Sequence, residues 1–552
     1  MKAKKIVSFI AAMAIAATMA VPATLSFAAP TTVTFTSTVA TDFSKYHAYQ
    51  LFVGNYANDK LGVTGFGSSV TGKEDEFIGI VNTFLTADKQ LATNALAGDV
   101  ANAIADNIKD ATDVSNFAKA LAAKGYTADP SVTFSTEEDD TKNTEATATF
   151  ATDGYYLVYP KTTESGDAAN LNYAYSSCIL LTTGAGTQTT VELKVTKPSV
   201  DKNVKEDRNN TFQKSADYEI GQEIEMQLVG NLSVDATEYA KYDTYNFIFH
   251  DTYSEGLDTP SDITAAIYAS DGTIKKENLT VTSDTDTPGK LTVNCGDIKA
   301  AGAAAGDKII VTYKTKLNGN AKVYNNLGNE NKVYLEYSNN PVSGGTGKTV
   351  EVPVTVATYG ADISKVQTGT TTKVAGAEFY LLKNVVTSDD SVPTTAKAAV
   401  LDANNKITGW VDAKIDNNTI TATGATKITT TTTGPMMVYG LDEGETYNLY
   451  ESKVPDGYNE PASRDNTFKI TTTLDADGTS GYPVTSITVD HTGWTVSGST
   501  GHVEGNIDNT LAGNLPSTGG MGRTILYVVG GAVVLGAGIL LITKKRLGKE
   551  ED

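Results

Sequence analysis

The chain of 552 residues is acidic, because 65 Asp and Glu residues outnumber 44 Lys and Arg residues and leave a formal net charge of −21. This charge argues against a nucleic-acid partner, since binding to phosphates depends on lysine and arginine. A self-repelling, well-solvated surface instead suits an exposed protein. At about 100–200 residues per domain, the chain is long enough for several domains.

The N-terminus has the pattern of a secretory signal peptide. Three lysines lie among the first five residues, an apolar run extends from Ile6 to about Val21, and small residues follow, ending in Ala28 and Ala29. A basic start, a short apolar stretch and small residues at its end are typical of such a peptide. We therefore predict that residues 1–29 are removed after Ala28 or Ala29 and that the mature chain is exported.

Residues 30–193 are expected to form a first domain that combines strands with helices. Leu96, Val100, Ile104 and Ile108 recur every four residues and predict one apolar helical stripe. A second helix carries Phe117 and Leu121 and can end at Gly125. Strand-like runs cover residues 33–35, 46–53, 132–134, 146–150, 155–158 and 178–181. The acidic cluster at residues 137–140 is interpreted as a solvated loop and not as a metal site.

Residues 194–357 and 358–511 are expected to form two further domains of short β-rich runs separated by turn residues. Neither shows helical periodicity of useful length, so an all-β sandwich is predicted for each. The expected fold class is therefore mostly β, with tandem immunoglobulin-like sandwiches, added helices in the first domain and a helix at the C-terminus. The two cysteines, Cys178 and Cys295, fall in different predicted domains; one disulfide or two buried free thiols are both open.

Residues 512–552 combine a proline-containing pentad, an apolar run and a basic tail. The run extends from about Thr524 to Thr543, long enough to cross a bilayer as a helix. The cations that follow, Lys544, Lys545 and Arg546, would hold its end at the cytoplasmic face. The pentad consists of Leu515, Pro516, Ser517, Thr518 and Gly519.

This pentad matches the LPXTG sorting signal of Gram-positive surface proteins, and the span and basic tail follow it in the order that such signals require. The resemblance implies that a sortase cleaves between Thr518 and Gly519 and joins Thr518 to an amine. Peptidoglycan is then one implied partner. A single-pass membrane anchor with a chance pentad is the alternative.

The segment from Tyr447 to Tyr458 reads Tyr-Asn-Leu-Tyr-Glu-Ser-Lys-Val-Pro-Asp-Gly-Tyr. It resembles the E-box of pilin and collagen-adhesin B-type (SpaA-like) domains, and residues 375–382 match a strand near the start of those domains. In that family a lysine of the first strand condenses with an asparagine of the last strand, and the E-box glutamate catalyses the reaction. The resemblance implies Lys365 as nucleophile, Glu451 as acid/base and Asn509 as electrophile, with Asn506 as the second choice of acceptor.

The physical chemistry of this cross-link makes the assignment testable. A lysine attacks only as the neutral amine, and burial lowers the pKa of a lysine. Burial raises the pKa of a carboxyl, which can then give a proton to the asparagine and take one from the amine. The reaction releases ammonia, leaves an amide bond and occurs once per chain, so it is maturation chemistry and not enzymatic turnover.

The middle domain contains a looser version of the same pattern. Lys202 lies on a predicted first strand, Asp251 follows an apolar strand, and Asn331 lies in a segment that resembles the late strand of an isopeptide-forming fimbrial domain. The resemblance implies the same three roles for them. Asn329 and Asn326 are alternative acceptors.

One lysine would turn such a subunit into a polymer. In backbone pilins it lies near the junction of the first two domains, in a segment resembling Val-x-Val-Tyr-Pro-Lys-Asn, and sortase joins its ε-amine to the threonine of the next subunit. Lys197 is ranked first by its position, although it precedes a proline instead of following one. Lys161, which ends a literal Val-Tyr-Pro-Lys run, and Lys194 are the alternatives.

An enzymatic function finds little support in the sequence. The four histidines are scattered and show no metal-ligand spacing. His250 adjoins Asp251, but no nucleophile elbow accompanies them. We predict no cofactor and no metal.

Together the motifs predict a major (backbone) pilin of a Gram-positive bacterium, a structural fibre subunit that is secreted and anchored to the cell wall. Its partners would be sortase, further copies of itself, peptidoglycan, ancillary pilins and host or community surfaces in adhesion. A wall-anchored adhesin that is not polymerised is the alternative. The adhesion ligand and the identity of the sortase are left open.

Overall fold

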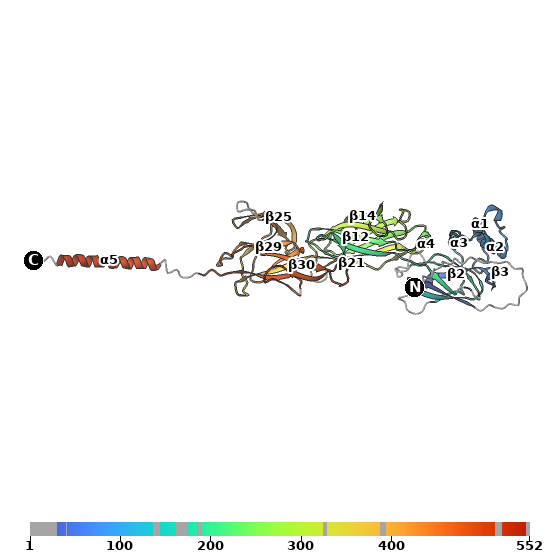
Figure 1. Ribbon diagram of the computed structural model, residues 1–552, viewed down its shortest axis with the longest axis horizontal. Coiled ribbons are helices and arrows are strands. Elements are labelled where there is room, and N and C mark those ends of the chain that lie inside the picture. The colour runs from blue at the N-terminus through green and yellow to red at the C-terminus, as the bar shows by residue number, and fades with distance from the viewer. Residues whose placement is uncertain are drawn as a thin grey trace, which may run out of the picture.

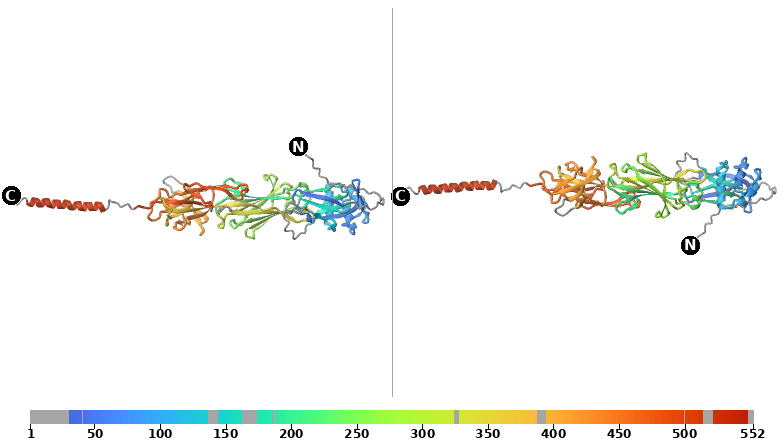
Figure 2. Two further views of the ribbon diagram at one scale, coloured as in Figure 1. Left: turned by 90° about the horizontal axis from the view of Figure 1, so that it is seen from below. Right: turned by 90° about the horizontal axis from the view of Figure 1, so that it is seen from above.

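The computed structural model describes residues 30–39, 41–135, 144–161, 174–184, 187, 189–323, 328–386, 394–498, 500–513 and 521–547. Three β-rich domains follow one another along one long axis, with helix α5 (Met521–Leu547) beyond the last of them (Figure 1). Views from two further sides keep this linear order (Figure 2). The predicted fold class of tandem, mostly β domains is confirmed. The predicted signal peptide, the acidic cluster at residues 137–140 and the sorting pentad lie outside the described residues.

The first domain packs two four-stranded sheets, ordered β4-β5-β1-β8 and β3-β2-β6-β7. Aromatic and aliphatic side chains such as Phe35 and Tyr156 fill the space between the sheets. The strands are β1 (Thr31–Ser37), β2 (Tyr46–Ala57), β3 (Lys60–Phe66), β4 (Phe134–Ser135), β5 (Glu145–Phe150), β6 (Gly154–Pro160), β7 (Ile179–Thr183) and β8 (Thr190–Leu193).

Three helices cover the outer face of the β2–β6 sheet: α1 (Glu74–Thr83), α2 (Ala97–Asn107) and α3 (Ala111–Ala123). The predicted stripe on α2 is correct for Val100, Ile104 and Ile108, which are buried, and wrong for Leu96, which is 74% exposed. Leu96 is the extended residue before the helix, so its side chain does not join the helical face. Gly125, with φ +66°, follows the end of α3 as predicted. Of the run 132–134, only Phe134 enters a strand.

The middle domain is a sandwich of two larger sheets around one apolar core. The first has the order β10-β9-β12-β18-β14-β15, and the second has the order β11-β21-β19-β13-β17-β16, with β20 paired to β19. One short helix, α4 (Ala236–Ala240), interrupts the strands. The first sheet contains β9 (Ser199–Glu206), β10 (Thr211–Gln213), β12 (Glu223–Asn231), β14 (Ser261–Tyr268), β15 (Lys275–Leu279) and β18 (Lys308–Lys316). The second contains β11 (Ser215–Asp217), β13 (Asn246–Tyr253), β16 (Thr282–Asp284), β17 (Lys290–Asp297), β19 (Asn329–Ser338), β20 (Thr346–Lys348) and β21 (Val352–Ala357).

The last domain packs a four-stranded sheet, ordered β28-β22-β33-β32, against a larger sheet ordered β26-β25-β24-β23-β29-β30-β31, with β27 paired to β23. Its first and last long strands, β22 and β33, pair in parallel. The small sheet contains β22 (Tyr359–Gln367), β28 (Met436–Leu441), β32 (Thr495–Val496) and β33 (Val503–Asn509). The larger one contains β23 (Glu378–Val386), β24 (Thr394–Leu401), β25 (Ile407–Asp416), β26 (Thr419–Thr421), β27 (Ile428–Thr429), β29 (Thr446–Lys453), β30 (Thr467–Leu474) and β31 (Val484–Val489).

The joint between the middle and last domains is rich in polar contacts. Glu219 of the middle domain accepts hydrogen bonds from Lys383, Trp410 and Tyr447 of the last. The hydroxyl of Tyr359 donates to Asp217. These contacts tie the two domains together from several strands.

The helix α5 contains a segment, Ile525–Arg546, that is long and apolar enough to cross a membrane. The side chains of this segment are not buried against the rest of the protein. Both cysteines lie in the described part of the chain, and neither forms a disulfide there; Cys295 is buried and Cys178 partly so.

Candidate functional site

The last domain brings Lys365, Glu451 and Asn509 together in its interior. Lys365 lies near the end of β22, Asn509 is the last residue of the neighbouring β33, and Glu451 lies on β29 of the opposite sheet. Strand alternation directs all three side chains into the space between the sheets. They are 2%, 1% and 2% exposed.

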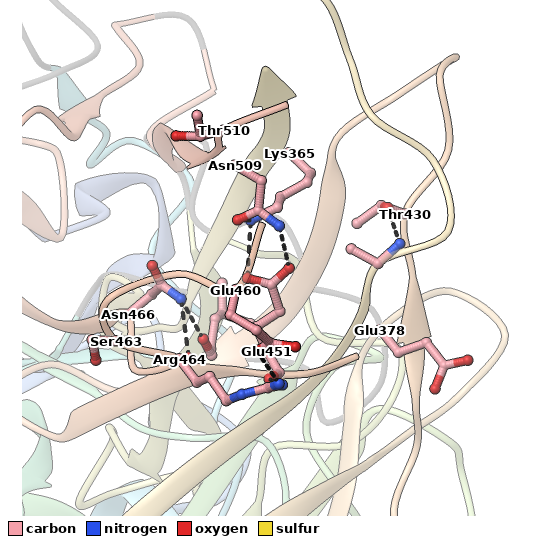
Figure 3. A network of polar contacts seen from close by, with 12 residues as sticks. Lys365, Glu378, Thr430, Glu451, Glu460, Ser463, Arg464, Asn466, Asn509 and Thr510 are labelled. Atoms are coloured by element: carbon pink, nitrogen blue, oxygen red, sulfur yellow. Dashed lines mark hydrogen bonds and ion pairs between the residues drawn. The ribbon is translucent and has the colours of Figure 1, made fainter. Parts of the chain in front are cut away.

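The three side chains form a closed hydrogen-bonded ring (Figure 3). The Lys365 Nζ atom donates to Glu451 Oε2 at 3.1 Å and to Asn509 Oδ1 at 2.8 Å. The Asn509 Nδ2 group donates to Glu451 Oε1 at 2.9 Å. The carboxyl therefore contacts the amine with one oxygen and the amide nitrogen with the other.

The alternative acceptor, Asn506, lies on the same strand but on its exposed side. Asn506 is three residues before Asn509, so the period of two of a strand turns its side chain away from the interior. The backbone carbonyl of Asn506 accepts a hydrogen bond from Trp494. The geometry thus favours Asn509.

The E-box segment forms strand β29 and the turn after it. Tyr447 and Leu449 belong to the core between the two sheets and Glu451 is buried beside it, whereas Tyr450 packs in a separate apolar cluster. The turn at Gly457 hydrogen-bonds to Ala512, just beyond β33. The guanidinium of Arg464 donates to the Glu451 carbonyl at 2.7 Å and so supports the glutamate from the neighbouring loop (Figure 3).

The middle domain contains a second buried group of a lysine, a carboxyl and an asparagine, with an aspartate in place of the glutamate. Lys202 lies on β9 of one sheet, while Asp251 on β13 and Asn331 on β19 belong to the other. They are 0%, 2% and 1% exposed. A bond between Lys202 and Asn331 would therefore connect the two sheets of this sandwich.

A fourth residue, Tyr313 of β18, lies at the centre of this group and was not identified from the sequence. Its hydroxyl accepts from Lys202 Nζ at 3.1 Å and from Asn331 Nδ2 at 2.7 Å, and it donates to Asp251 Oδ2 at 3.0 Å. Lys202 Nζ also donates directly to Asp251 Oδ2. In sequence, Tyr313 reads as one more inward aromatic residue of an alternating strand, which gives no sign of a polar role.

The two alternative acceptors of the middle domain differ from Asn331. The side chain of Asn329 is occupied by the backbone, because it bonds to Lys322 through both its oxygen and its nitrogen and also donates to Val356. It therefore holds a turn in place. Asn326 lies outside the described residues.

Burial shifts the pKa of both lysines and of Asp251 toward the protonation states that an internal amide cross-link would need. Desolvation lowers the pKa of Lys202 and of Lys365, which favours the neutral, nucleophilic amine. Desolvation raises the pKa of Asp251, which favours the protonated acid. Neutral amine and neutral acid are the pair that starts an acid–base-assisted attack on an amide.

The lysines proposed for polymerisation lie outside these cores. Lys197 is partly buried, on the segment between β8 and β9, and Lys194 on the same segment is exposed. Lys161 is exposed and directly follows Pro160, whose carbonyl accepts from Asn340 of the middle domain at 3.4 Å. All three thus lie toward the junction of the first two domains.

The histidine next to Asp251 does not join the buried group. His250 points to the opposite face of β13, where it stacks on Tyr334 and contacts Glu336 Oε2 at 2.9 Å. Over the part of the chain that the structure describes, no three or more His, Cys, Asp or Glu side chains are placed to hold a metal ion.

Residues 360–480 match the family model described as SpaA, a prealbumin-like fold domain. This match covers Lys365 and Glu451 and confirms the resemblance found in the E-box segment. A comparison with curated proteins finds no match.

Among solved structures, the chain is similar to the T6 backbone pilin of serotype M6 Streptococcus pyogenes, with 15% identity over 89% of this chain and 100% of that one, and a TM-score of 0.49. It is also similar to the full-length major pilin SpaD from Corynebacterium diphtheriae, with 16% identity over 89% and 99% and a TM-score of 0.45. The major pilin subunit BcpA of Bacillus cereus has 12% identity over 88% and 100% and a TM-score of 0.36.

Proposed function

We propose that this protein is the backbone subunit of a covalent surface pilus. In this proposal, sortase joins Thr518 of one copy to a lysine of the next, and the last transfer attaches the fibre to the cell wall. The observation that carries the proposal is the buried ring of Lys365, Glu451 and Asn509, which has the groups and contacts for an internal amide cross-link.

Strand connectivity supports a role under tension. The chain enters the last domain through β22 and leaves it through β33, and both strands carry one partner of the proposed bond near their C-terminal ends. A bond between Lys365 and Asn509 would pass a pulling force directly from one strand to the other. The 144 positions that separate them would then carry none of that force.

The middle domain supports the same role. Its first strand, β9, carries Lys202, and Asn331 lies at the start of β19, after which only β20 and β21 precede the last domain. Two cross-links in series would give a shaft that resists both pulling and proteolysis. They would replace the disulfides that many exported domains use.

The anchoring part of the proposal is supported by α5 and its basic end. A helix with Lys544, Lys545 and Arg546 in its last turn stops in the membrane with that end at the cytoplasmic face. Such a stop holds the preceding pentad on the outer side, where sortase acts.

The proposal is tested with an immunoblot of wall material released by a muramidase from cells that carry the parent, Lys197→Ala, Lys161→Ala or Lys194→Ala. We expect a ladder of high-mass species that survives boiling in detergent and collapses to a single band in Lys197→Ala. Collapse in Lys161→Ala or Lys194→Ala alone would keep the pilus and move the junction to that lysine. A single band in the parent would contradict polymerisation and leave a wall-anchored adhesin.

A further inference from the structure

The two buried groups differ in how the carboxyl reaches the asparagine. In the last domain, Glu451 contacts both reactants, with Oε2 on the lysine and Oε1 on the amide nitrogen of Asn509. In the middle domain, the shorter Asp251 contacts the lysine, and no direct hydrogen bond joins it to Asn331 among the described residues. The Tyr313 hydroxyl lies between them and bonds to both.

The Tyr313 hydroxyl uses all of its hydrogen-bonding capacity inside this group. A hydroxyl has one hydrogen to donate and two lone pairs to accept with. Tyr313 donates its hydrogen to Asp251 and accepts from Lys202 and from Asn331. A hydroxyl that contacts the base, the nucleophile and the leaving nitrogen at once is placed to move a proton among them.

We propose that the Tyr313 hydroxyl is the proton relay of the middle domain. It accepts a proton from Asp251 and donates its own proton to the departing nitrogen of Asn331. This inference rests on the proposed cross-linking function. In the middle domain, the tyrosine hydroxyl connects the carboxyl to the asparagine. In the last domain, the extra methylene group of Glu451 lets its carboxyl reach the asparagine directly. There the corresponding aromatic ring near the lysine belongs to Phe379, which has no hydroxyl.

A relay is needed because the amide nitrogen of Asn331 must gain a proton before it can leave. The neutral amine of Lys202 attacks the Asn331 Cγ atom and forms the Nζ–Cγ bond. The amide nitrogen then becomes a pyramidal amine with a free lone pair, so it changes from a donor to an acceptor. Protonated Asp251 donates to the tyrosine oxygen, and the tyrosine hydrogen passes to Nδ2.

The balance of atoms closes without another reactant. As the Cγ–Nδ2 bond breaks, Nδ2 leaves as ammonia with its two hydrogens and the one relayed to it. The excess proton on Nζ returns to Asp251, which ends as it began. The products are one amide bond and one ammonia molecule, and no group is oxidised or reduced.

The surroundings keep Tyr313 in the protonated form that a relay needs. Burial and the nearby Asp251 raise the pKa of its hydroxyl well above the usual value. The hydroxyl therefore passes a proton by accepting one as it donates another, without forming a phenolate. In both steps its neighbours are already within hydrogen-bond distance.

The test compares the full chain with Tyr313→Phe and Tyr337→Phe, using proteolytic digests taken at fixed times after synthesis. The measured quantity is the fraction of Lys202 found in a cross-linked peptide with Asn331. Tyr337 is the matched control, since it is a buried tyrosine of the same core whose hydroxyl has no hydrogen-bond partner in the described part of the chain. We expect Tyr313→Phe to slow closure about 100-fold, the lower end of what positioned proton transfer contributes.

A second variant separates a relay from a structural role. Asp251→Glu, added to Tyr313→Phe, lengthens the carboxyl as in the last domain, and we expect it to restore much of the rate. Cross-linking of Lys365 to Asn509 in the same molecules reports that the chain has folded. Closure of Tyr313→Phe at the rate of Tyr337→Phe, or no recovery in the double variant, would overturn the relay. A parent without the Lys202 bond would instead overturn the proposed cross-linking of this domain.

Discussion

At the residue scale, two buried lysines each lie beside a carboxyl and an asparagine. Among the described residues of the first domain no lysine is buried, so the pattern is confined to the two domains that follow. Leaving a lysine and a carboxyl in an apolar core costs free energy. The proposed conversion of the lysine to an amide would replace this cost with a covalent tie.

We predict that Glu451→Ala leaves the last domain folded, without its cross-link and less stable to heat. Closing a loop of 144 positions contributes about 5 kcal/mol by a chain-entropy estimate made for disulfides. For a domain of this size, the expected decrease in Tm is roughly 10 to 20 °C. Calorimetry of the parent and the variant measures this decrease.

The control for this prediction is Glu460→Ala, which removes an exposed carboxyl near the same site. It should keep the cross-link and nearly the full Tm. An equal Tm for the parent and Glu451→Ala would show that the glutamate has no part in stabilising the domain.

At this scale, the sequence predicted the site residues that belong to a motif with fixed spacing. Lys365, Glu451 and Asn509 were predicted from the E-box resemblance, and the structure brings them within hydrogen-bond distance. Tyr313 was missed, because an inward tyrosine on an alternating strand looks the same whether it fills space or binds a polar group. Only the positions of β13 and β19 across the core reveal its contacts.

At the scale of elements, the parallel pair β22 and β33 carries both partners of the proposed bond. Gln367 pairs with Asn509, so the proposed bond lies at the shared C-terminal end of the two strands. Force that enters β22 would reach β33 through that bond before it could separate the sheets.

We predict that Lys365→Met allows the last domain to extend under tension, while the parent does not. Without the bond, the 144 positions between the partners can unravel to roughly 500 Å at 3.3–3.6 Å per residue. Single-molecule force spectroscopy measures this extension. Asn506→Ala, on the exposed side of β33, is the matched control and should behave as the parent. An extension of that size in the parent would show that its bond is open.

Strand β28 contains Gly440, which lies against the middle domain at the joint between the middle and last domains. Gly440 has φ +96°, and a Cβ atom added there would lie 2.8 Å from Ile220 Cδ1 of the middle domain. Its carbonyl also accepts from the Ile220 amide at 3.2 Å. The close approach of the two domains at this point leaves no room for a side chain.

We predict that Gly440→Ala lowers the free energy of unfolding more than Gly457→Ala, a substitution outside this joint. Both positions are left-handed, so each substitution costs about 1–2 kcal/mol of backbone strain. Gly457 has open space around its Cβ position, whereas Gly440 would add about 1–3 kcal/mol of overpacking. Urea denaturation of the two variants gives the difference, and equal midpoints would contradict the packing argument.

The strand-like pattern of the first domain predicted β2, β5, β6 and β7, because each of these strands contributes side chains to a core. Such patterns failed at short polar edge strands such as β15 and β16, whose residues are largely exposed. Edge strands are held by backbone pairing and bury few side chains, so composition does not distinguish them from loops.

At the scale of the whole molecule, the joint between the middle and last domains gathers carboxyls from distant parts of the chain. Burial raises the pKa of Asp217 to about 8 and that of Asp442 to about 10, with further contributions from neighbouring acids. The groups around them are Glu206, Asp207, Arg208, Tyr359, Glu443 and Thr472. No local pattern predicted this cluster, since Asp217 and Asp442 read as ordinary strand-end residues.

We predict that this joint loses stability as the pH rises. These carboxyls hold their protons more tightly in the folded chain than in the unfolded one, where aspartate titrates near 3.9. Between that value and the raised pKa values of about 8 and 10, the folded state binds more protons, so stability falls with increasing pH. The Tm of the middle and last domains should therefore be lower at pH 8 than at pH 5.5.

The variant for this prediction is Asp217→Asn, which keeps a side-chain oxygen for Tyr359 and Thr472 and removes one titrating group. It should flatten the dependence of Tm on pH over this range. Asp456→Asn, on an exposed turn, should leave the dependence unchanged. If Tm depends on pH in Asp217→Asn as it does in the parent, the Asp217 carboxyl does not cause the dependence.

The most direct measurement for the whole account is the peptide map of the folded parent chain, digested and analysed by mass spectrometry. The proposed covalent shaft predicts two peptide pairs, Lys202 with Asn331 and Lys365 with Asn509, each lighter than the sum of its parts by one ammonia molecule. Recovery of all four residues in separate, unmodified peptides would contradict it. The two buried groups would then be ordinary hydrogen-bonded clusters, and the proposed covalent shaft would lose its internal bonds.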